Sequence, residues 1–341
     1  MNNIECEFIS LDNCWDKEVQ NHTFDIYHLS GWLKSSSAID GGEAKGLMVK
    51  FNNKNILFPL IARKLDNDYW DATSTYGFGG PLGESKFTVE ELDILVEFTL
   101  DFLKKEKCVS WFLRLNPILN KDWNSSIGTL VEHGPTLSSD LTKTEEEHWS
   151  ETQNQHRRGI KKAIKSGVEI EISSLNEENC IVFSKIYAET MRHLNASKFY
   201  FFDYSYFLKL AKNLSERLIL VTAYYEGLAI SSSIYSHCKE SGIMQYHLGG
   251  TLNDYRNLQP AKLITHKAIE WGRQNDYKTL HLGGGLGAQR DSLYSYKKGF
   301  SSNEHLFKTH RFIVDYDKYK DLLEVDTRID ILDGFFPLYR L

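Results

Sequence analysis

Four titratable side chains border two glycine turns in the last third of the sequence: Tyr246, His247, Asp291 and Lys297. The first turn is Gly249-Gly250 and the second begins at Gly283. Glycines at a strand end let a ligand approach the backbone, and free N–H groups there can bind a carbonyl or phosphate oxygen. Histidine, tyrosine and carboxylate side chains beside such a turn are candidates for proton transfer.

Two strands and a helix are expected to position these residues. Met244–Leu248 and Thr279–Leu282 are short apolar runs that end at glycines. Between them, Pro260 suits a first helical turn, and apolar residues recur at helical spacing through 261–274. This order places two strand ends and one helix N-terminus on the same side, where N–H groups converge.

Composition excludes several classes of protein. The 341 residues are 41% hydrophobic and 25% charged, which is typical of a globular protein long enough for two domains. The net charge of −6 gives no broad basic field for nucleic acid or membrane. Five scattered cysteines without metal-ligand spacing predict neither disulfides nor a metal site, and no apolar run reaches a spanning length. We therefore expect a cytoplasmic protein with no membrane span.

A weaker copy of the arrangement occurs in the first half. Residues 71–82 end a strand in glycines, 89–105 have helical spacing, and 109–115 form a strand pattern. A hairpin pattern precedes each copy, at 47–61 and 218–235. We interpret this as a tandem repeat of one α+β unit, with chance similarity as the alternative.

A basic amphipathic helix is predicted between the copies. Residues 154–167 place Arg157, Lys161 and Lys165 at intervals of four, with Arg158 beside them. The simpler interpretation is a solvated helix face at the start of the second domain. The functional interpretation is a cradle for the phosphates of a donor.

The domain boundary is expected near Ser150, because residues 118–150 have no clear periodicity. The prediction is an α+β chain with domains at 1–150 and 151–323 and a C-terminal tail, 324–341. The last part of that tail is expected to pack back on the body.

Several blocks in the second half resemble the FemAB group of tandem GNAT-type acyltransferases. They are RRGIKKAIKSGVEIE from Arg157, ETMRHLNASKFYFFDYSYFLKL from Glu189, YHLGGT from Tyr246, Pro260 opening a helix, and LGGG with DSLYSYKKGF from Leu282 and Asp291. In the first half, YHLSGW from Tyr27 and DATSTYGFGGPL from Asp71 resemble FemAB-like proteins of surface-polysaccharide loci. The resemblance implies two GNAT-like domains, each a mixed central sheet flanked by helices.

The resemblance also implies an activity. Members transfer an acyl or aminoacyl group directly to an amine on a cell-envelope precursor, often a nucleotide-linked sugar or peptidoglycan-type precursor. The first domain would bind this acceptor and the second would transfer the group. No tightly bound cofactor is implied, and the donor would be acetyl-CoA or aminoacyl-tRNA as co-substrate.

One departure from the resemblance concerns the donor. Residues 255–260, YRNLQP, lack the glycines of the GNAT pyrophosphate loop, so both donors stay open. Acetyl-CoA would place its pyrophosphate at the helix N-terminus beside Arg256 and Asn257. Transfer RNA would instead be held by Arg157 and Arg158.

The resemblance places the pair Tyr296-Lys297 at the transfer site, with Lys297 facing the donor phosphate or the developing oxyanion. Lys297 and Asp291 are expected in an exposed loop, so that truncation of either costs little stability. His247 is a further candidate for proton transfer. Its alternative is to pack on the face of the sheet opposite Tyr246. The match of 283–288 to a dinucleotide fingerprint is rejected, because no helix opens at its end in a βαβ unit.

Acceptor contacts are predicted from aromatic and polar residues. Tyr200 belongs to an aromatic run too dense for one helix face. In the first domain the candidates are His28, Trp32, Asp71 and Tyr76, with burial in the core as the alternative for the two aromatic side chains. The predicted function is N-acyl or N-aminoacyl transfer, and the alternative is an inactive tandem-GNAT protein that binds a ligand or partner.

Overall fold

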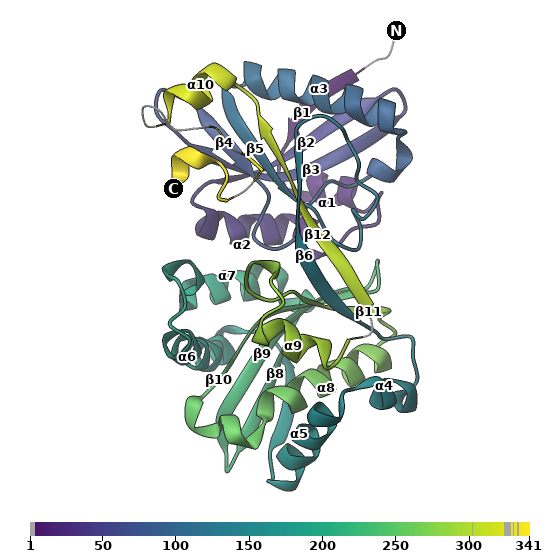
Figure 1. Cartoon of the computed structure of the whole chain (residues 1–341), viewed down its shortest axis with the longest axis vertical. Coiled ribbons are helices and arrows are strands. Elements are labelled where there is room, and N and C mark those ends of the chain that lie inside the picture. Colours follow the sequence, from purple (N-terminus) through teal and green to yellow (C-terminus); the bar gives the residue numbers. More distant parts are fainter. Residues whose placement is uncertain (1–3, 302, 324–328, 330, 333) are drawn as a thin grey trace. The chain divides into compact units, whose positions relative to one another are not determined.

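The computed structural model describes residues 4–301, 303–323, 329, 331–332 and 334–341. It divides into two compact units (Figure 1). Unit 1 is Met1–Gly134 with Leu306–Leu341, and unit 2 is Pro135–His305. These boundaries differ from those expected at residues 150 and 323.

The chain changes unit inside two long strands. It enters unit 2 within β6, Thr129–Asp140, and returns within β12, Asn303–Ile313. Residues 129–135 of β6 are half-buried or exposed without regular alternation, so the sequence shows no strand period there. Because no polar linker marks either crossing, composition placed the boundary too late and assigned 306–323 to the wrong unit.

Unit 1 is built on a sheet in the order β1-β2-β3-β4-β5-β12. The strands besides β12 are β1 Ile4–Ile9, β2 Glu43–Phe51, β3 Lys54–Lys64, β4 Trp70–Thr73 and β5 Cys108–Arg114. Neighbouring strands are antiparallel, except that β4 and β5 are parallel. The helices are α1 Asn13–Val19, α2 Ser30–Asp40, α3 Val89–Lys105 and α10 Tyr316–Asp321.

The main core of unit 1 lies between this sheet and α3, whereas α2 covers the opposite face (Figure 1). Thr88 caps α3, since its hydroxyl accepts from the Glu91 N–H and the Glu91 carboxylate accepts in return from Thr88. The buried face of α3 meets Trp111 and Leu113 of β5. The side chains of β5 that alternate with these two therefore point to the other face of the sheet.

The C-terminal tail packs on unit 1. Tyr319 of α10 and Phe336 are buried together with Val109, and Phe336 also lies against Phe112. Phe336 belongs to the predicted tail and packs back as expected, while 324–328, 330 and 333 lie outside the described part of the chain.

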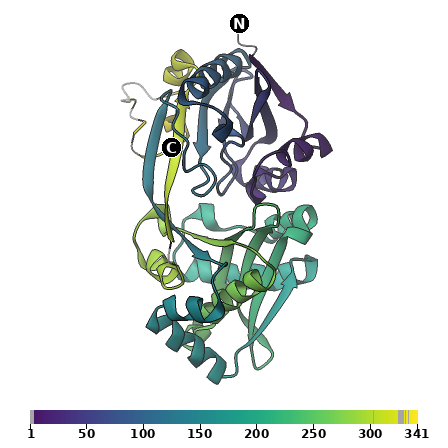
Figure 2. The ribbon, with the colours of Figure 1, turned by 90° about the vertical axis from the view of Figure 1, so that its right-hand side faces the viewer.

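Unit 2 has a sheet in the order β6-β11-β10-β9-β8-β7. The strands besides β6 are β7 Glu169–Ser174, β8 Leu218–Tyr225, β9 Leu228–Cys238, β10 Ile243–Thr251 and β11 Thr279–Gly283. The helices are α4 Glu145–Glu151, α5 Asn154–Lys165, α6 Glu177–His193, α7 Tyr204–Leu214, α8 Pro260–Gln274 and α9 Ser292–Lys298. Helices α5 and α8 cover one face, and α6 and α7 cover the other (Figures 1 and 2).

The two units repeat one arrangement, as the sequence predicts. In each, a hairpin leads to a strand, a long helix and a strand parallel to the first: β4, α3 and β5 in unit 1, and β10, α8 and β11 in unit 2. The α+β tandem fold is therefore confirmed. Within the described part of the chain, no helix combines the length and apolar character needed to cross a bilayer.

Candidate functional site

The two parallel strands of unit 2 separate at their carboxyl ends. Strands β10 and β11 pair only through Ile243–Gln245 and Thr279–His281. Strand β10 then continues to Thr251 along β9, with an irregular register between Tyr246 and Leu248. The pairing between β10 and β11 thus stops at Tyr246, next to the glycine turn that follows β11.

Lys297 reaches this turn from helix α9. Its Nζ donates a hydrogen bond of 2.7 Å to the carbonyl oxygen of Gly284 and lies 5.4 Å from the ring centre of Tyr246. Gly283 has φ +74°, and a Cβ there would lie 3.4 Å from Nζ, so glycine suits both the turn and the lysine. The expected exposed loop is wrong: Lys297 lies in a helix and is only 7% exposed.

Burial has an electrostatic consequence for Lys297. Desolvation lowers the pKa of its ammonium group to about 8, against a smaller opposing effect of Asp291. The side chain is therefore mainly protonated at neutral pH, yet it loses its proton in a mildly basic solution.

A small pocket adjoins the lysine. Its lining is Tyr246, Thr265, Leu282, Leu293, Tyr296, Lys297 and Phe300. The space has room for about one water-sized group. Except for the lysine it carries no charged side chain, so the ammonium is the dominant charge at its wall.

Two tyrosines frame this pocket. The hydroxyl of Tyr296 donates to the carbonyl oxygen of Ala261 at 2.9 Å and lies 2.9 Å from the Thr265 hydroxyl. Burial raises the pKa of Tyr246 to about 12, so its hydroxyl keeps its proton. A Cβ at Gly249 would lie 2.5 Å from the Tyr246 hydroxyl, so this glycine lets the ring lie along the strand.

His247 lies away from the pocket. Its Nε2 is 2.9 Å from the hydroxyl of Tyr206 on α7, which covers the face opposite α8. Burial lowers the pKa of His247 to about 3, so the ring is neutral. The geometry thus favours the packing alternative over a role in proton transfer.

Asp291 caps helix α9. Its carboxylate accepts from the N–H of Tyr294 at 2.8 Å and from the N–H of Leu286 at 2.9 Å. Gly285 lies so close that a Cβ there would be 2.2 Å from an Asp291 oxygen. Asp291 therefore joins the glycine turn to the helix that carries Lys297, which makes it a positioning residue.

The segment that leads into α8 does not have the backbone conformation of a glycine loop. Residues Asn253–Leu258 form a 3-10 helix, and Gln259 adopts φ +62° before Pro260. The N–H of Tyr255 donates to Leu252 and that of Gln259 to Arg256, so these amides are already used. Arg256 and Asn257 are exposed in this segment.

Helix α5 packs against the start of α8. Gly159 allows this approach, because a Cβ there would lie 2.6 Å from the Lys262 side chain. Burial lowers the pKa of Lys262. Arg158 is exposed, whereas Arg157 donates to the carbonyl oxygens of Trp149 and Ser150 at 3.1 and 3.2 Å. The two arginines, which the sequence treats as a pair, therefore differ: Arg157 links α4 to α5, and Arg158 stays available to a ligand.

Tyr200 is half-buried in unit 2. It belongs to a 3-10 helix, Lys198–Tyr200, and its ring packs edge-on against Phe199 at 5.3 Å. Its carbonyl oxygen accepts from the Tyr187 hydroxyl at 2.8 Å. Phe199 and Phe201 are exposed by 47% and 43%, so the aromatic run lies partly outside the core, as predicted.

In unit 1, two predicted acceptor contacts are core residues. His28 and Trp32 are fully buried, and the Trp32 indole donates to the carbonyl oxygen of Tyr76 at 2.9 Å. Burial lowers the pKa of His28 to about 4. Their side chains are closed to a ligand in this conformation, whereas Tyr76 is half-buried.

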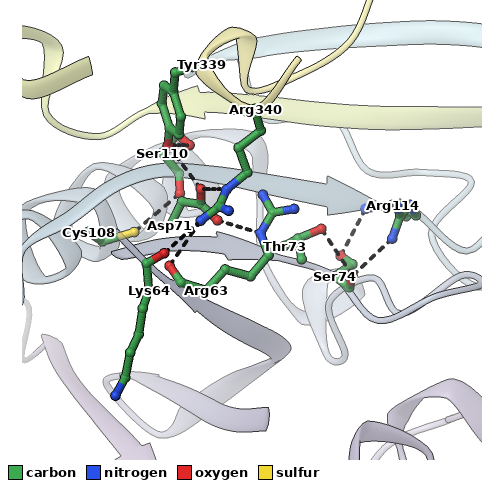
Figure 3. A network of polar contacts seen from close by, with 10 residues as sticks. All are labelled: Arg63, Lys64, Asp71, Thr73, Ser74, Cys108, Ser110, Arg114, Tyr339 and Arg340. Atoms are coloured by element: carbon green, nitrogen blue, oxygen red, sulfur yellow. Dashed lines mark hydrogen bonds and ion pairs between the residues drawn. The ribbon is translucent and has the colours of Figure 1, made fainter. Parts of the chain in front are cut away.

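Asp71 is fully buried in an ion-pair network (Figure 3). Its carboxylate accepts from Nε of Arg63 at 2.6 Å and from Nε of Arg340 at 2.5 Å. The Tyr339 hydroxyl lies 3.3 Å from Asp71 and 2.8 Å from the Ser110 hydroxyl. Asp71 therefore holds the C-terminal residues, and its predicted contact with an acceptor is wrong.

Sequence reasoning missed several residues that line the pocket. Thr265, Leu282, Leu293 and Phe300 belong to apolar patterns that look the same in a core. One usable signal was Leu282, the last apolar residue before the glycines.

Comparison with known proteins agrees with this geometry. Residues 150–298 match the family model described as the acetyltransferase (GNAT) domain. No curated protein matches the sequence. A GNAT domain implies an acyl-CoA co-substrate and no tightly bound cofactor.

Solved structures that share the fold include the following three. FemX is 15% identical with a TM-score of 0.70, covering 93% of this chain and 99% of its own. L-PGS from Bacillus licheniformis is 12% identical with a TM-score of 0.55, and the match covers 87% and 90%. A tandem GNAT protein from the clavulanic acid biosynthesis pathway is 8% identical with a TM-score of 0.51, covering 92% and 99%. The chain is accordingly an acyltransferase with a FemAB-like tandem GNAT fold.

Proposed function

We propose that the protein transfers an acetyl or aminoacyl group from an activated donor directly to an amine. The acceptor is a nucleotide-linked amino sugar or a related cell-envelope precursor. The observation that carries this proposal is the buried Lys297 ammonium beside a small pocket at the point where β10 and β11 separate. The sequence resemblance to the FemAB group supports the acceptor class.

The reaction needs no covalent enzyme intermediate. The acceptor nitrogen attacks the donor carbonyl carbon, so that a C–N bond forms and an oxyanion develops. When the oxyanion collapses, the C–S or C–O bond to the donor breaks, and the proton lost by the amine ends on the leaving group. In this proposal the Lys297 ammonium stabilises the oxyanion; its charge, its burial and its hydrogen bond to Gly284 support that role.

Exposed cations near the start of α8 would bind the donor phosphates. Arg158 and Arg256 supply charge on neighbouring elements, since α5 packs against α8 through Gly159 and Lys262. Side chains take this role because the amides around Tyr255 and Gln259 are used within the chain. The same charges suit coenzyme A or the phosphates of a tRNA acceptor end.

Each unit keeps one predicted acceptor contact, Tyr76 in unit 1 and Tyr200 in unit 2, and each is proposed as a contact of its own unit. Both side chains are half-buried and so can lose further surface to a ligand.

Mass spectrometry of products tests the proposal. The full chain is incubated with a panel of nucleotide-linked amino sugars and either acetyl-CoA or aminoacyl-tRNA. We expect a mass increase of one acetyl or aminoacyl group on an acceptor, and far less product with Lys297→Met in the same time. Acceptor binding without product from either donor would instead support an inactive binding protein.

A further inference from the structure

Two arginines of unit 1 have guanidinium groups that the fold uses only in part. Arg63 donates through Nε to Asp71, and within the described residues nothing else binds its guanidinium. Arg114 donates through Nη1 to the carbonyl oxygens of Ser74 and Thr75, at 3.1 and 3.4 Å. Each side chain therefore keeps N–H donors that could bind an oxygen from outside the chain.

The two arginines lie on one face of the sheet. Arg63 pairs directly with Asp71 across β3 and β4, and Arg114 ends β5, where its N–H donates to the Ser74 hydroxyl at 2.9 Å. Figure 3 shows both guanidinium groups on the same side of these strands, with Thr73 and Ser74 between them. This is the face opposite the α3 core, because Trp111 and Leu113 of β5 point the other way.

A carboxylate lies at the edge of the same face, because α2 packs on β2 and β3 and the register pairs Glu43 with Ala62, the neighbour of Arg63. Asp40 is the last residue of α2, and its Oδ2 is buried without a hydrogen-bond partner among the described residues. Desolvation raises the pKa of Asp40, while the charges of Arg114 and then Arg63, and a hydrogen bond from the Tyr76 backbone, oppose that rise. Neither arginine forms an ion pair with it in the part of the chain that the structure describes.

Stability alone does not account for this carboxylate. A negative charge at a helix C-terminus is unfavourable, because the helix dipole is negative there. A buried acceptor without a donor adds a further desolvation cost. A ligand that places a donor group against Asp40 would remove the cost.

We propose that Arg63, Arg114 and Asp40 form a ligand site within unit 1. Its ligand carries a phosphate or carboxylate next to an ammonium or hydroxyl group. The guanidinium groups bind the anion, because their planar N–H donors suit both a phosphate and a carboxylate. Asp40 accepts a hydrogen bond from the neighbouring ammonium or hydroxyl group. The site lies apart from Lys297 in sequence and element, so binding there needs no acyl donor and does not rest on the proposed reaction.

Matched pairs of probes test the proposal on the full chain by calorimetry. O-Phosphoethanolamine is compared with ethyl phosphate, and β-alanine with propionate, since each pair differs chiefly by the ammonium group. We expect at least one ammonium-bearing probe to bind more tightly than its partner, and the better pair identifies phosphate or carboxylate as the preferred anion. Equal or absent binding of all four probes overturns the proposal.

Three variants assign the contacts. Arg114→Gln should weaken both members of the better pair by about tenfold or more, since a charge-assisted hydrogen bond is lost. Asp40→Asn should remove the preference for the ammonium-bearing probe. Lys121→Gln, at an exposed lysine of the same unit, should bind like the native chain.

Thermal melting separates binding from folding. Asp40→Asn should keep or raise Tm, because it removes a buried charge, and a marked loss of Tm would make Asp40 a structural residue and overturn its role. Arg114 also supports two carbonyl groups, so Arg114→Lys is included; it keeps the charge and should bind with intermediate affinity. Native affinity in Arg114→Gln would overturn the proposal.

Discussion

The Nζ atom of Lys297 donates a 2.7 Å hydrogen bond to the carbonyl oxygen of Gly284. This contact joins the helix that carries the lysine to the turn that ends β11. It also leaves two further N–H donors on the ammonium, whose Nζ lies 5.4 Å from the ring centre of Tyr246. A cation held in this way needs little reorganisation when an oxyanion develops next to it.

Lys297→Met is expected to lower kcat by about 100-fold or more, because it removes a preorganised cation while keeping side-chain volume. Tm should stay near or above the native value, since a desolvated charge is lost. Steady-state kinetics and thermal melting measure the two effects. Lys298→Met is the control, because the Lys298 side chain is 36% exposed and its Nζ lies 3.6 Å from Oε2 of Glu304. An equal loss of kcat in both variants would remove Lys297 from the site.

The pH dependence of kcat should report the same ammonium. With a pKa of about 8 in the folded protein, Lys297 loses its charge as pH rises through that value, so kcat should fall above about pH 8. In Lys297→Arg the charge persists, and the fall should disappear even if the maximum rate is lower. A native kcat that rises through pH 8 would make the neutral amine the active form.

Stability should depend on pH in the opposite direction. The ordinary pKa of lysine, 10.5, applies to the unfolded chain, and the folded value is about 8. Between these values the unfolded chain binds the proton and the folded chain does not, so the free energy of unfolding rises with pH. Denaturant melts of the native chain and Lys297→Met, at pH 7.5 and 10, measure this; a constant difference between them contradicts the burial of the lysine.

Periodicity was sufficient to predict the repeated part of the fold. Helices α3 and α8 have strong apolar spacing, and Pro260 marks the start of α8, so both were found nearly to the residue. Strand β6 was missed, because burial along it does not alternate: 129–135 are half-buried or exposed and 136–139 are all buried. The unit boundary, which lies inside β6, could not be read from composition for the same reason.

At the candidate site, residue type was more informative than exposure. The glycine turn and Lys297 were singled out, yet the sequence placed the lysine in an exposed loop, because Asp291 and Ser292 look polar until Asp291 is seen capping a helix. For His247 the bulge in β10 and the contact with Tyr206 decide its side of the sheet. Such long-range contacts have no local signal in the chain.

Asp291 is predicted to affect the reaction by holding the helix that carries Lys297. Asp291→Ala should destabilise the protein by about 1 kcal/mol, as expected for loss of a helix cap, and lower kcat as Lys297 shifts. Asp291→Asn, which can still cap the helix, should recover most of both. Thermal melting and kcat measure these effects. If Asn restores stability but not kcat, the carboxylate charge itself contributes to the reaction.

Substitution of the adjacent Arg157 and Arg158 should affect donor binding and stability differently. Arg158→Ala removes an exposed cation and should weaken donor affinity with little change in Tm, whereas Arg157→Ala should lower Tm because it breaks the contacts with Trp149 and Ser150. Calorimetry with acetyl-CoA and with tRNA measures the affinities, and salt titration identifies a phosphate contribution. Unchanged affinity for both donors in Arg158→Ala would mean that α5 presents only a solvated face.

The C-terminal residues should be needed for the stability of unit 1. Arg340→Gln leaves the fully buried Asp71 with Arg63 as its remaining cation, so we expect a loss of about 2 kcal/mol, less than for a buried charge left with no partner. Asp71→Asn should also destabilise, since two arginines lose their acceptor. In the double variant the losses should not add, because both residues belong to one ion pair. Chemical denaturation of the four proteins completes this cycle, and strictly additive losses would show that Asp71 and Arg340 act independently.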